Sequence, residues 1–265
     1  MFVDSHCHLS FPELKEKLPE IRAAMAAAKV DRALCICTTL EGFPEVHALA
    51  MAHENFWASA GVHPDTEGVT EPDVQTLVEL AGRPKVVGIG ETGLDYYRLN
   101  GRSMADMEWQ RERYRNHIVA SQRTGKPLII HTRSASDDTI AILREAGSPA
   151  LGGVFHCFTE TKAVARAALD LGFCISFSGI LTFRNADELR EVARMVPLDR
   201  CLIETDSPYL APVPFRGKTN NPSYLPYIAA ELARIKGVPL ETVAVATSEN
   251  FERLFGLSRA AGSAP

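Results

Sequence analysis

Histidines and carboxylates recur in this sequence at positions that could bind metal ions. His6 and His8 form a His-x-His pair near the start of the chain. Because residues two apart on a strand face the same way, their side chains are expected to project together, with Cys7 pointing away. The further candidates are spread along the chain: His63, Glu91, His131, His156 and Asp206. Imidazole and carboxylate ligands together predict a divalent metal site.

These residues are too many for one closed structural zinc site. With His63 left aside, the other candidates suffice for two ions that share a bridging carboxylate and keep positions open for water and substrate. Such a site lowers the pKa of a metal-bound water and makes hydroxide available near neutral pH. Asp206 is the candidate general base, and His63 could either coordinate or donate to a developing negative charge. The nitrogen and oxygen ligands admit Mg, Mn, Zn, Co or Fe.

Short, apolar, β-prone runs alternate with longer segments of helical period, and these elements must position the candidates. The predicted strands are Phe2–Asp4, Ala33–Cys37, Phe56–Ala60, Val86–Ile89, Leu128–Ile130, Gly153–Phe155, Phe173–Phe177 and Cys201–Ile203. The predicted helices are Leu14–Ala28, Phe43–His53, Pro72–Ala81, Ser103–Thr124, Asp137–Ala146, Thr161–Leu171, Asn185–Val196, Pro222–Lys236 and Pro239–Phe255. This alternation predicts a parallel sheet that closes into a single-domain (β/α)8 TIM barrel. A doubly wound open sheet is the competing fold, but no Gly-x-Gly-x-x-Gly turn supports it.

Every metal-site candidate follows or ends one of the predicted strands. In a barrel all these positions lie on the C-terminal face, where barrel enzymes build their active sites. Scattered packing histidines would not concentrate there, so the placement strengthens the metal interpretation. His47, His53 and His117 lie inside predicted helices, and we expect ordinary surface or packing roles for them. Cys7 and Cys157, beside candidate ligands, are expected to be small buried residues.

The composition is that of an acidic globular protein. The 265 residues carry a formal charge of −5, which argues against a basic surface that coats nucleic acid but leaves nucleic acid open as a substrate. The six cysteines form no Cys-x-x-Cys pair, so we expect reduced thiols and a cytoplasmic protein. No signal peptide or membrane-spanning run is evident, and no membrane partner is expected. We expect one domain over residues 1–258 and a flexible tail over residues 259–265.

Taken together, these motifs resemble the TatD-related metal-dependent hydrolases, within the amidohydrolase-like barrels. The resemblance covers nearly the whole chain, from Phe2 to about Phe255. The segments that carry it are Asp4–Leu9, Gly61–Pro64, Gly90–Tyr96, Pro127–Arg133, Phe155–Phe158, Ser176–Ile180, Glu204–Leu210, Arg216–Lys218 and Asn250. Two positions depart from the family pattern: Glu160 stands where glycine is common, and Asn221 where glutamate is usual. Both lie outside the candidate ligands, so they bear on substrate detail rather than on hydrolysis.

The resemblance implies a division of the ligands between two metals. His6 and His8 would bind one metal, with Asp206 contributing, and Glu91 would bridge to the second. The ligands of the second metal would be His131 and His156. The resemblance also implies a cytosolic deoxyribonuclease, often a 3′-to-5′ exonuclease that prefers single strands, with single-stranded DNA as the expected partner.

Cationic residues near the predicted strand ends independently favour phosphoester chemistry. Arg133 lies two residues beyond His131, and Arg216 and Lys218 lie in a Pro/Gly-rich loop after the last strand. Cations there could hold phosphate oxygens, although solvated loop charges are the alternative for the last two. Three tyrosines could stack on bases near the same face or could simply pack: Tyr96, Tyr97 and Tyr209.

Two other classes of function stay open. An acyl hydrolase could use the same metals to cleave a D-aminoacyl-tRNA ester or a small cyclic amide. Many cyclic amidohydrolases bridge their metals with a modified lysine, and here Glu91 stands at the strand-four position, which disfavours the amide but not the ester. A barrel kept only as a scaffold should have lost ligands, and none is missing. The sequence does not indicate an oligomeric state.

Overall fold

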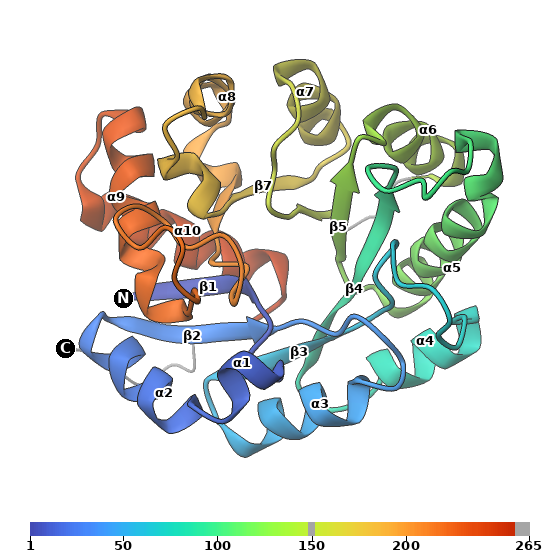
Figure 1. Cartoon of the computed structure of the whole chain (residues 1–265), viewed down its shortest axis with the longest axis horizontal. Coiled ribbons are helices and arrows are strands. Elements are labelled where there is room, and N and C mark those ends of the chain that lie inside the picture. The colour runs from blue at the N-terminus through green and yellow to red at the C-terminus, as the bar shows by residue number, and fades with distance from the viewer. Residues whose placement is uncertain (148–151, 258–265) are drawn as a thin grey trace.

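Eight strands form one sheet in which each strand pairs in parallel with the next along the chain. The structure is a computed structural model that describes residues 1–147 and 152–257. The strands are β1 (Phe2–Cys7), β2 (Val30–Cys35), β3 (Phe56–Ala60), β4 (Val86–Asp95), β5 (Leu128–Arg133), β6 (Gly153–Phe155), β7 (Cys174–Phe177) and β8 (Cys201–Ile203). Helices alternate with the strands and surround them (Figure 1). The predicted single-domain TIM barrel is confirmed, and the strictly sequential strand order rules out the doubly wound alternative.

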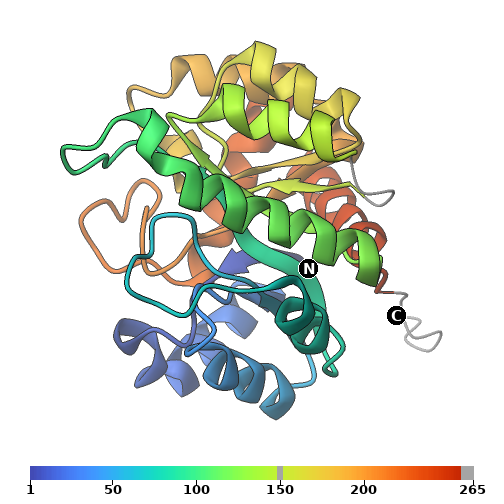
Figure 2. The same cartoon turned by 90° about the vertical axis from the view of Figure 1, so that its right-hand side faces the viewer.

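The helices of the described residues form the outer layer. The α-helices are α1 (Pro12–Lys15), α2 (Leu18–Ala27), α3 (Phe43–Ala52), α4 (Val74–Ala81), α5 (Glu108–Thr124), α6 (Ser136–Ala146), α7 (Lys162–Asp170), α8 (Asp187–Met195), α9 (Leu225–Lys236) and α10 (Leu240–Leu254). The 3₁₀ helices are η1 (Met104–Met107), η2 (Gly179–Thr182), η3 (Leu198–Arg200) and η4 (Pro222–Tyr224). The helix predicted over Leu14–Ala28 is two helices, because Pro19 has no N–H to continue the first one. Figure 2 shows the long loops after β3, β4 and β8 extending from one end of the barrel.

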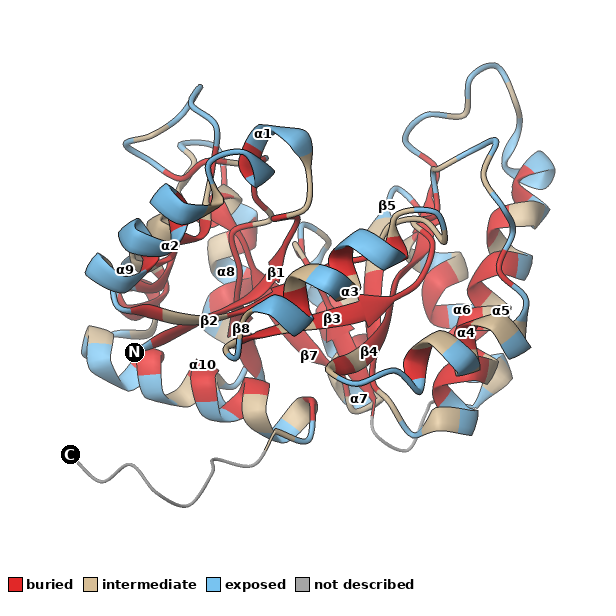
Figure 3. Cartoon of the chain, turned by 90° about the horizontal axis from the view of Figure 1, so that it is seen from below, coloured by how far each residue is buried: buried red, intermediate tan, exposed pale blue. Residues whose placement is uncertain are grey.

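Apolar side chains fill the opposite, N-terminal end of the barrel. An apolar cluster there joins residues in or next to the strands to one phenylalanine of α10 and one directly after it: Val3, Leu34, Ile36, Ile129, Val154, Cys174, Leu202, Phe251 and Phe255. A second, larger core lies between the strands and the helices, so the strands are buried on both faces and the outer helix faces are exposed (Figure 3). Burial on both faces is the reason that the strands are apolar runs rather than alternating ones. Polar strand residues are therefore left for the C-terminal mouth.

Three strands run further toward that mouth than the sequence predicted. β1, β4 and β5 continue beyond their predicted ends, so His6, Glu91 and His131 lie within strands rather than after them. β4 carries one extra residue relative to β5 here. Ile89 pairs with Leu128 and Thr92 pairs with Ile130, so three steps along β4 match two steps along β5. β1 has the same irregularity between Asp4 and Cys7. An extra residue bends a strand and redirects a side chain, and both irregularities occur where His6 and Glu91 enter the mouth.

The barrel closes between β8 and β1 through side-chain hydrogen bonds and, just beyond β8, through backbone hydrogen bonds from Asp206 to His6 and from His8 to Ser207. The hydroxyl of Ser5 donates to the carbonyl oxygen of Ile203 at 3.0 Å. Asp4 accepts hydrogen bonds from the backbone N–H of Thr205 at 2.9 Å and from its hydroxyl at 2.5 Å. Among the described residues no regular ladder pairs β8 with β1, so these buried polar contacts hold the seam.

Several expectations concern the chain as a whole. The six cysteines are free thiols. No helix within residues 1–147 and 152–257 has the length and apolar character needed to cross a membrane. The predicted tail, residues 259–265, and the predicted domain boundary at residue 258 lie outside the described residues.

Candidate metal centre

The carboxylate of Glu91 lies in the C-terminal mouth, and each of its oxygens faces different histidines. Oε2 is 3.3 Å from Nε2 of His6 and 4.0 Å from Nε2 of His8. Oε1 is 2.7 Å from Nε2 of His156 and 3.2 Å from Nδ1 of His131. The structure therefore brings these five predicted residues together, with Glu91 between two pairs of imidazoles.

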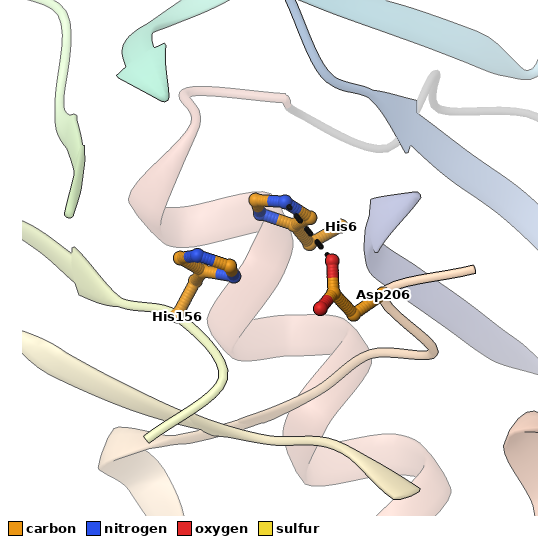
Figure 4. A group of neighbouring side chains, drawn as sticks. All are labelled: His6, His156 and Asp206. Carbon is orange, nitrogen blue, oxygen red and sulfur yellow. Dashed lines mark ion pairs between the residues drawn. The ribbon is translucent and has the colours of Figure 1, made fainter. Parts of the chain in front are cut away.

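Asp206 adds a second carboxylate on the side of the first pair. Its Oδ1 is 3.2 Å from Nε2 of His8 and 3.7 Å from Nε2 of His6. Its backbone N–H donates to the carbonyl oxygen of His6 at 3.0 Å, which ties the end of β8 to β1. Figure 4 shows Asp206 and His156 flanking His6, whose ring stacks on that of His156 with 3.8 Å between the centroids. All six residues predicted as ligands thus share one site.

The donor atoms fit divalent cations in both spacing and chemistry. Three sets have ligand atoms within 4.8 Å of one another: His6, His8 and Glu91; His6, His156 and Asp206; and His63, Glu91 and His131. Around an ion with bonds of about 2.1 Å, neighbouring ligand atoms lie roughly 3–3.5 Å apart, close to the spacing seen here. In the part of the chain that the structure describes, buried nitrogens that form no hydrogen bond include both of His6 and Nε2 of His156, although Nε2 of each lies close to Glu91. A buried nitrogen without a hydrogen bond is costly, and a cation would use its lone pair.

The histidines keep both carboxylates in the charged form that a ligand requires. Burial would raise the pKa of Glu91, but the charges of His156, His63 and His6 hold that pKa well below its usual range. Burial would also raise the pKa of Asp206, but the hydrogen bond from His8 and the charge of His6 lower it. Metal ligands must be deprotonated, so both carboxylates are ready to bind cations at neutral pH.

His63 lies beside this centre on the loop after β3. Its Nε2 is 3.3 Å from Oε1 of Glu91, and its Nδ1 is 2.7 Å from Oδ1 of Asp65. Burial would lower the pKa of His63, but the charge of Glu91 and the hydrogen bond to Asp65 raise it to about 10. The imidazole can therefore bind Asp65 through Nδ1 and present Nε2 to the mouth, either as a proton donor or, when neutral, as a ligand.

Two further carboxylates orient the second pair of histidines, and neither was predicted from the sequence. Oδ2 of Asp95 is 2.9 Å from Nε2 of His131. Oε1 of Glu204 is 3.1 Å from Nδ1 of His156 and also accepts from the backbone N–H of Cys157 at 2.6 Å. Carboxylates that bind the outer nitrogen of a histidine fix its tautomer and ring orientation. The sequence did contain a signal for both carboxylates, since they lie at strand ends like the predicted ligands. Asp95 is the last residue of β4, and Glu204 directly follows β8.

The predicted cationic residues stack on aromatic rings. The guanidinium of Arg133 is 3.6 Å from the ring centroid of Tyr97, and that of Arg216 is 3.7 Å from the centroid of Phe183. Nζ of Lys218 lies farther from a ring, at 5.7 Å from the centroid of Phe215. None of these three cations forms an ion pair with a carboxylate of residues 1–147 or 152–257. Their donors are therefore free to contact a ligand.

A cavity of about 460 Å³ lies next to the Asp206 side of the mouth. Arg216, Lys218, Tyr209 and Glu13 line it, so the two cations border this cavity and not Glu91 itself. Tyr209 is 52% exposed, and its ring centroid is 6.3 Å from that of His8. Tyr209, in the loop that follows β8, thus lies between this cavity and the metal-ligand candidates.

The remaining candidates have structural surroundings. Tyr96 packs rather than stacks, because its hydroxyl donates to Asp138 at 2.7 Å and accepts from Arg111 at 2.8 Å. Cys7 is buried as expected, whereas Cys157 is only half-buried. His117 is fully buried, and both of its ring nitrogens are hydrogen-bonded.

Comparisons with known proteins agree with this fold and identify the family of the chain. The sequence profile of the family described as TatD related DNase matches residues 3–256. The uncharacterized metal-dependent hydrolase YcfH of Escherichia coli is 48% identical over 257 residues, which are 96% of this chain and 95% of that protein. The 3′-5′ ssDNA/RNA exonuclease TatD of Klebsiella pneumoniae is 31% identical over 96% of this chain and 97% of its own.

A solved structure shows the same architecture. The crystal structure of YjjV, a TatD homologue from Escherichia coli, superposes with a TM-score of 0.90 at 28% identity, and the match covers 97% of this chain and 98% of that one. The profile match over almost the entire chain and the identity to YcfH both exceed what a shared barrel fold alone would give. The chain therefore belongs to the TatD family of metal-dependent hydrolases.

Proposed function

We propose that this protein is a nuclease that hydrolyses phosphodiester bonds of single-stranded DNA from the 3′ end, at two divalent cations. His6, His8 and Asp206 would hold one cation, His131 and His156 would hold the other, and Glu91 would serve both. The observation that carries the proposal is the position of Glu91, whose Oε2 faces His6 and His8 while its Oε1 faces His131 and His156. A carboxylate between two sets of donors favours two ions over one.

Divalent cations held by these residues, Mg, Mn or Zn, would make hydroxide available near neutral pH and would offset the charge of the phosphate under attack. Asp206 acts as the general base. Its Oδ1 is engaged by His8, whereas no hydrogen bond involves its Oδ2 within the described residues. Oδ2 is therefore the oxygen that takes the proton of the attacking water. The low pKa of this carboxylate keeps it unprotonated until the reaction begins.

His63 binds the substrate phosphate rather than a metal. Asp65 holds its Nδ1 and favours the protonated ring, so Nε2 donates to a phosphate oxygen as negative charge develops. Cations bound to Glu91 would offset the charge of that carboxylate, and Asp65 would then be the main partner that keeps His63 protonated. Asp65 is therefore part of the proposed machinery.

Arg133, Arg216 and Lys218 hold phosphates adjacent to the cleaved bond. Each lacks a carboxylate partner among the described residues, and the two arginines stack on aromatic rings, so their donors are free for anionic oxygens. Exposed Tyr209 beside Arg216 and Lys218 offers a surface on which a base can stack. These features favour a nucleotide chain over the acyl substrates.

The preference for a single strand, the 3′-to-5′ direction and a cytoplasmic location are also parts of the proposal. The name of the Klebsiella pneumoniae relative supports the first two. The six free cysteines support a reducing compartment.

A labelled oligonucleotide assay tests the proposal. Purified protein loaded with Mg, Mn or Zn is incubated with single-stranded DNA labelled at the 5′ or the 3′ end. We expect a ladder of shortened products from the 5′ label, immediate mononucleotide release from the 3′ label, and no products after EDTA treatment. The same oligonucleotide with a blocked 3′ end should resist cleavage, and internal fragments from it would indicate an endonuclease instead.

Matched substrates in the same experiment separate the alternatives. Duplex DNA and single-stranded RNA of the same sequence test the preference for single-stranded DNA. A mischarged D-aminoacyl-tRNA tests the acyl alternative. Hydrolysis of the ester alone, with no nucleotide released under any metal, would overturn the nuclease proposal. Absence of bound metal and of all hydrolysis would point to the scaffold alternative.

A further inference from the structure

A buried arginine of helix α5 forms hydrogen bonds with the loop that carries His63. Arg113 is 2% exposed, and its Nη1 donates to the carbonyl oxygens of His63 at 2.6 Å and Thr66 at 2.9 Å. Its Nε donates to Oε2 of Glu71 at 2.8 Å, and its Nη2 bonds to the other oxygen of Glu71. The ring of Trp109 covers the guanidinium at 4.8 Å. Figure 2 shows the cyan loop after β3 next to the green helix α5.

A histidine one turn further along α5 holds the other side of the same loop. Nε2 of His117 accepts from the backbone N–H of Val62 at 3.0 Å, and its Nδ1 donates to the carbonyl oxygen of Arg113 at 2.8 Å. Because Nε2 is the acceptor, the ring is neutral with its proton on Nδ1. Val62 precedes His63, so the two side chains of α5 fix the backbone immediately before and after the catalytic candidate.

The loop begins at Gly61, whose backbone packs directly against that of β4. A Cβ atom on Gly61 would overlap the carbonyl carbon of Gly90, the residue before Glu91. The backbone N–H of His63 donates to the carbonyl oxygen of Thr38 at 2.9 Å. Small shifts of the loop backbone would therefore move His63 relative to Glu91, which is 3.3 Å away.

We propose that Arg113 and His117 are positioning residues for hydrolysis, which fix the imidazole of His63 against Glu91 and the mouth. Within the described residues, neither side chain contacts one of the six proposed metal ligands or lines the mouth cavity. A buried arginine is costly, and an apolar side chain could fill its place, but only the planar guanidinium can serve two loop carbonyls and one carboxylate at once. This inference rests on the role proposed above for His63.

Conservative variants test it. Arg113→Lys keeps the positive charge but loses the planar guanidinium with its several donors. His117→Phe keeps an aromatic ring but leaves the N–H of Val62 without an acceptor. We expect kcat on bis(p-nitrophenyl) phosphate to fall by about 10- to 100-fold in each, as for a misplaced catalytic group, with KM and metal content unchanged. His117→Gln restores an acceptor near Nε2 and should recover most of the activity. Arg115→Lys, on the exposed face of the same helix, is the matched control.

A double-mutant comparison separates positioning from stability. If Arg113 and His117 act through His63, adding either substitution to His63→Ala should cause no further loss of kcat. Equal losses in the wild-type and His63→Ala backgrounds would overturn the inference. Melting temperatures of all variants show whether each is folded at the assay temperature, and Arg113→Lys carries the test alone if His117→Phe is not.

A readout that needs neither metal nor turnover completes the test. In metal-free protein labelled with ¹⁵N-histidine, the ring resonances of His63 should shift in Arg113→Lys and in His117→Phe. Those of His47 and His53, which lie on and directly after α3, should not. Unchanged His63 resonances would overturn the inference. If these resonances shift while even the wild-type protein fails to cleave any phosphodiester, the proposed nuclease function fails and the positioning by α5 stands.

Discussion

The carboxylate of Asp4 accepts two hydrogen bonds from Thr205, one from its backbone N–H at 2.9 Å and one from its hydroxyl at 2.5 Å. Both residues are fully buried, and they join the first strand to the loop after the last. Asp4 lies two residues before His6, and Thr205 lies one residue before Asp206. This contact therefore sets the distance between a proposed metal ligand and the proposed base.

Removing the seam contact should cost both stability and activity. Asp4→Ala removes the acceptor of the buried N–H groups of Thr205 and His6, and leaves the Thr205 hydroxyl only Ser207 as a partner. Each buried donor left without an acceptor costs about 1–3 kcal/mol, so we expect the free energy of unfolding to fall by roughly 2–4 kcal/mol. Urea unfolding of the metal-free protein measures this change. Thr205→Val removes only the hydroxyl and should cost less. Asp199→Asn, at an exposed aspartate, is the control; an Asp4→Ala variant as stable as this control would contradict the seam role.

Glu91→Gln should remove metal from the site without unfolding the protein. The amide presents an N–H₂ group to one set of histidines, where the carboxylate presents an oxygen to both, so the variant cannot bridge two cations. Metal analysis after loading and dialysis should find a large loss relative to the wild type, together with loss of hydrolysis. Glu13→Gln, an exposed carboxyl at the rim of the mouth, should retain the wild-type metal content.

Asp206→Asn should lower kcat by about 10²- to 10⁴-fold, the usual range for a lost general base. KM should change little, because Asp206 is not proposed to bind the DNA. Steady-state kinetics with saturating metal separates this effect from weakened metal binding. Near-normal kcat in this variant would show that another group takes the proton of water.

Arg216→Ala combined with Lys218→Ala should weaken binding of the nucleotide chain while sparing the chemistry. We expect a higher KM for an oligonucleotide and a shallower dependence of binding on salt, by roughly one unit of slope for each phosphate that these cations no longer neutralise. Kinetics on bis(p-nitrophenyl) phosphate, which has no neighbouring phosphate for these two cations to hold, should be unchanged. The control removes two exposed cations from the N-terminal end, Arg22→Ala with Lys29→Ala. Equal effects of the two pairs would indicate a general charge effect.

Protonation of buried His117 should make stability depend on pH. Burial lowers the pKa of His117 from 6.5 to about 4, so between these values the unfolded chain binds a proton that the folded chain does not. The stabilising effect is fully present above pH 6.5 and is lost as the pH falls toward 4, by about 3 kcal/mol in total. Urea unfolding in EDTA across this range should show a shallower slope for His117→Gln than for the wild type. Parallel curves for the two proteins would refute this assignment.

The sequence by itself determined the fold class and which residues meet at the candidate site. Apolar runs that alternate with helical segments are strong signals, because parallel strands buried on both faces require them. The position of His63, Glu91, His131, His156 and Asp206 at strand ends then followed from topology, since all strands of a parallel barrel end at one face. Helix ends were less accurate. The break in the helix predicted over Leu14–Ala28 was missed, although Pro19, which has no N–H, was a local signal for it.

Only the tertiary structure decided how those side chains face one another. Extra residues in β1 and β4 redirect His6 and Glu91, and the pairing partners that create such irregularities are far apart in the sequence. The contacts of Asp4 with Thr205 join residues 201 positions apart, and those of Arg113 with the loop of His63 join elements whose distance depends on helix packing. Residue type predicts which atoms can bind a metal, but their orientation depends on non-local contacts that no spacing along the chain encodes.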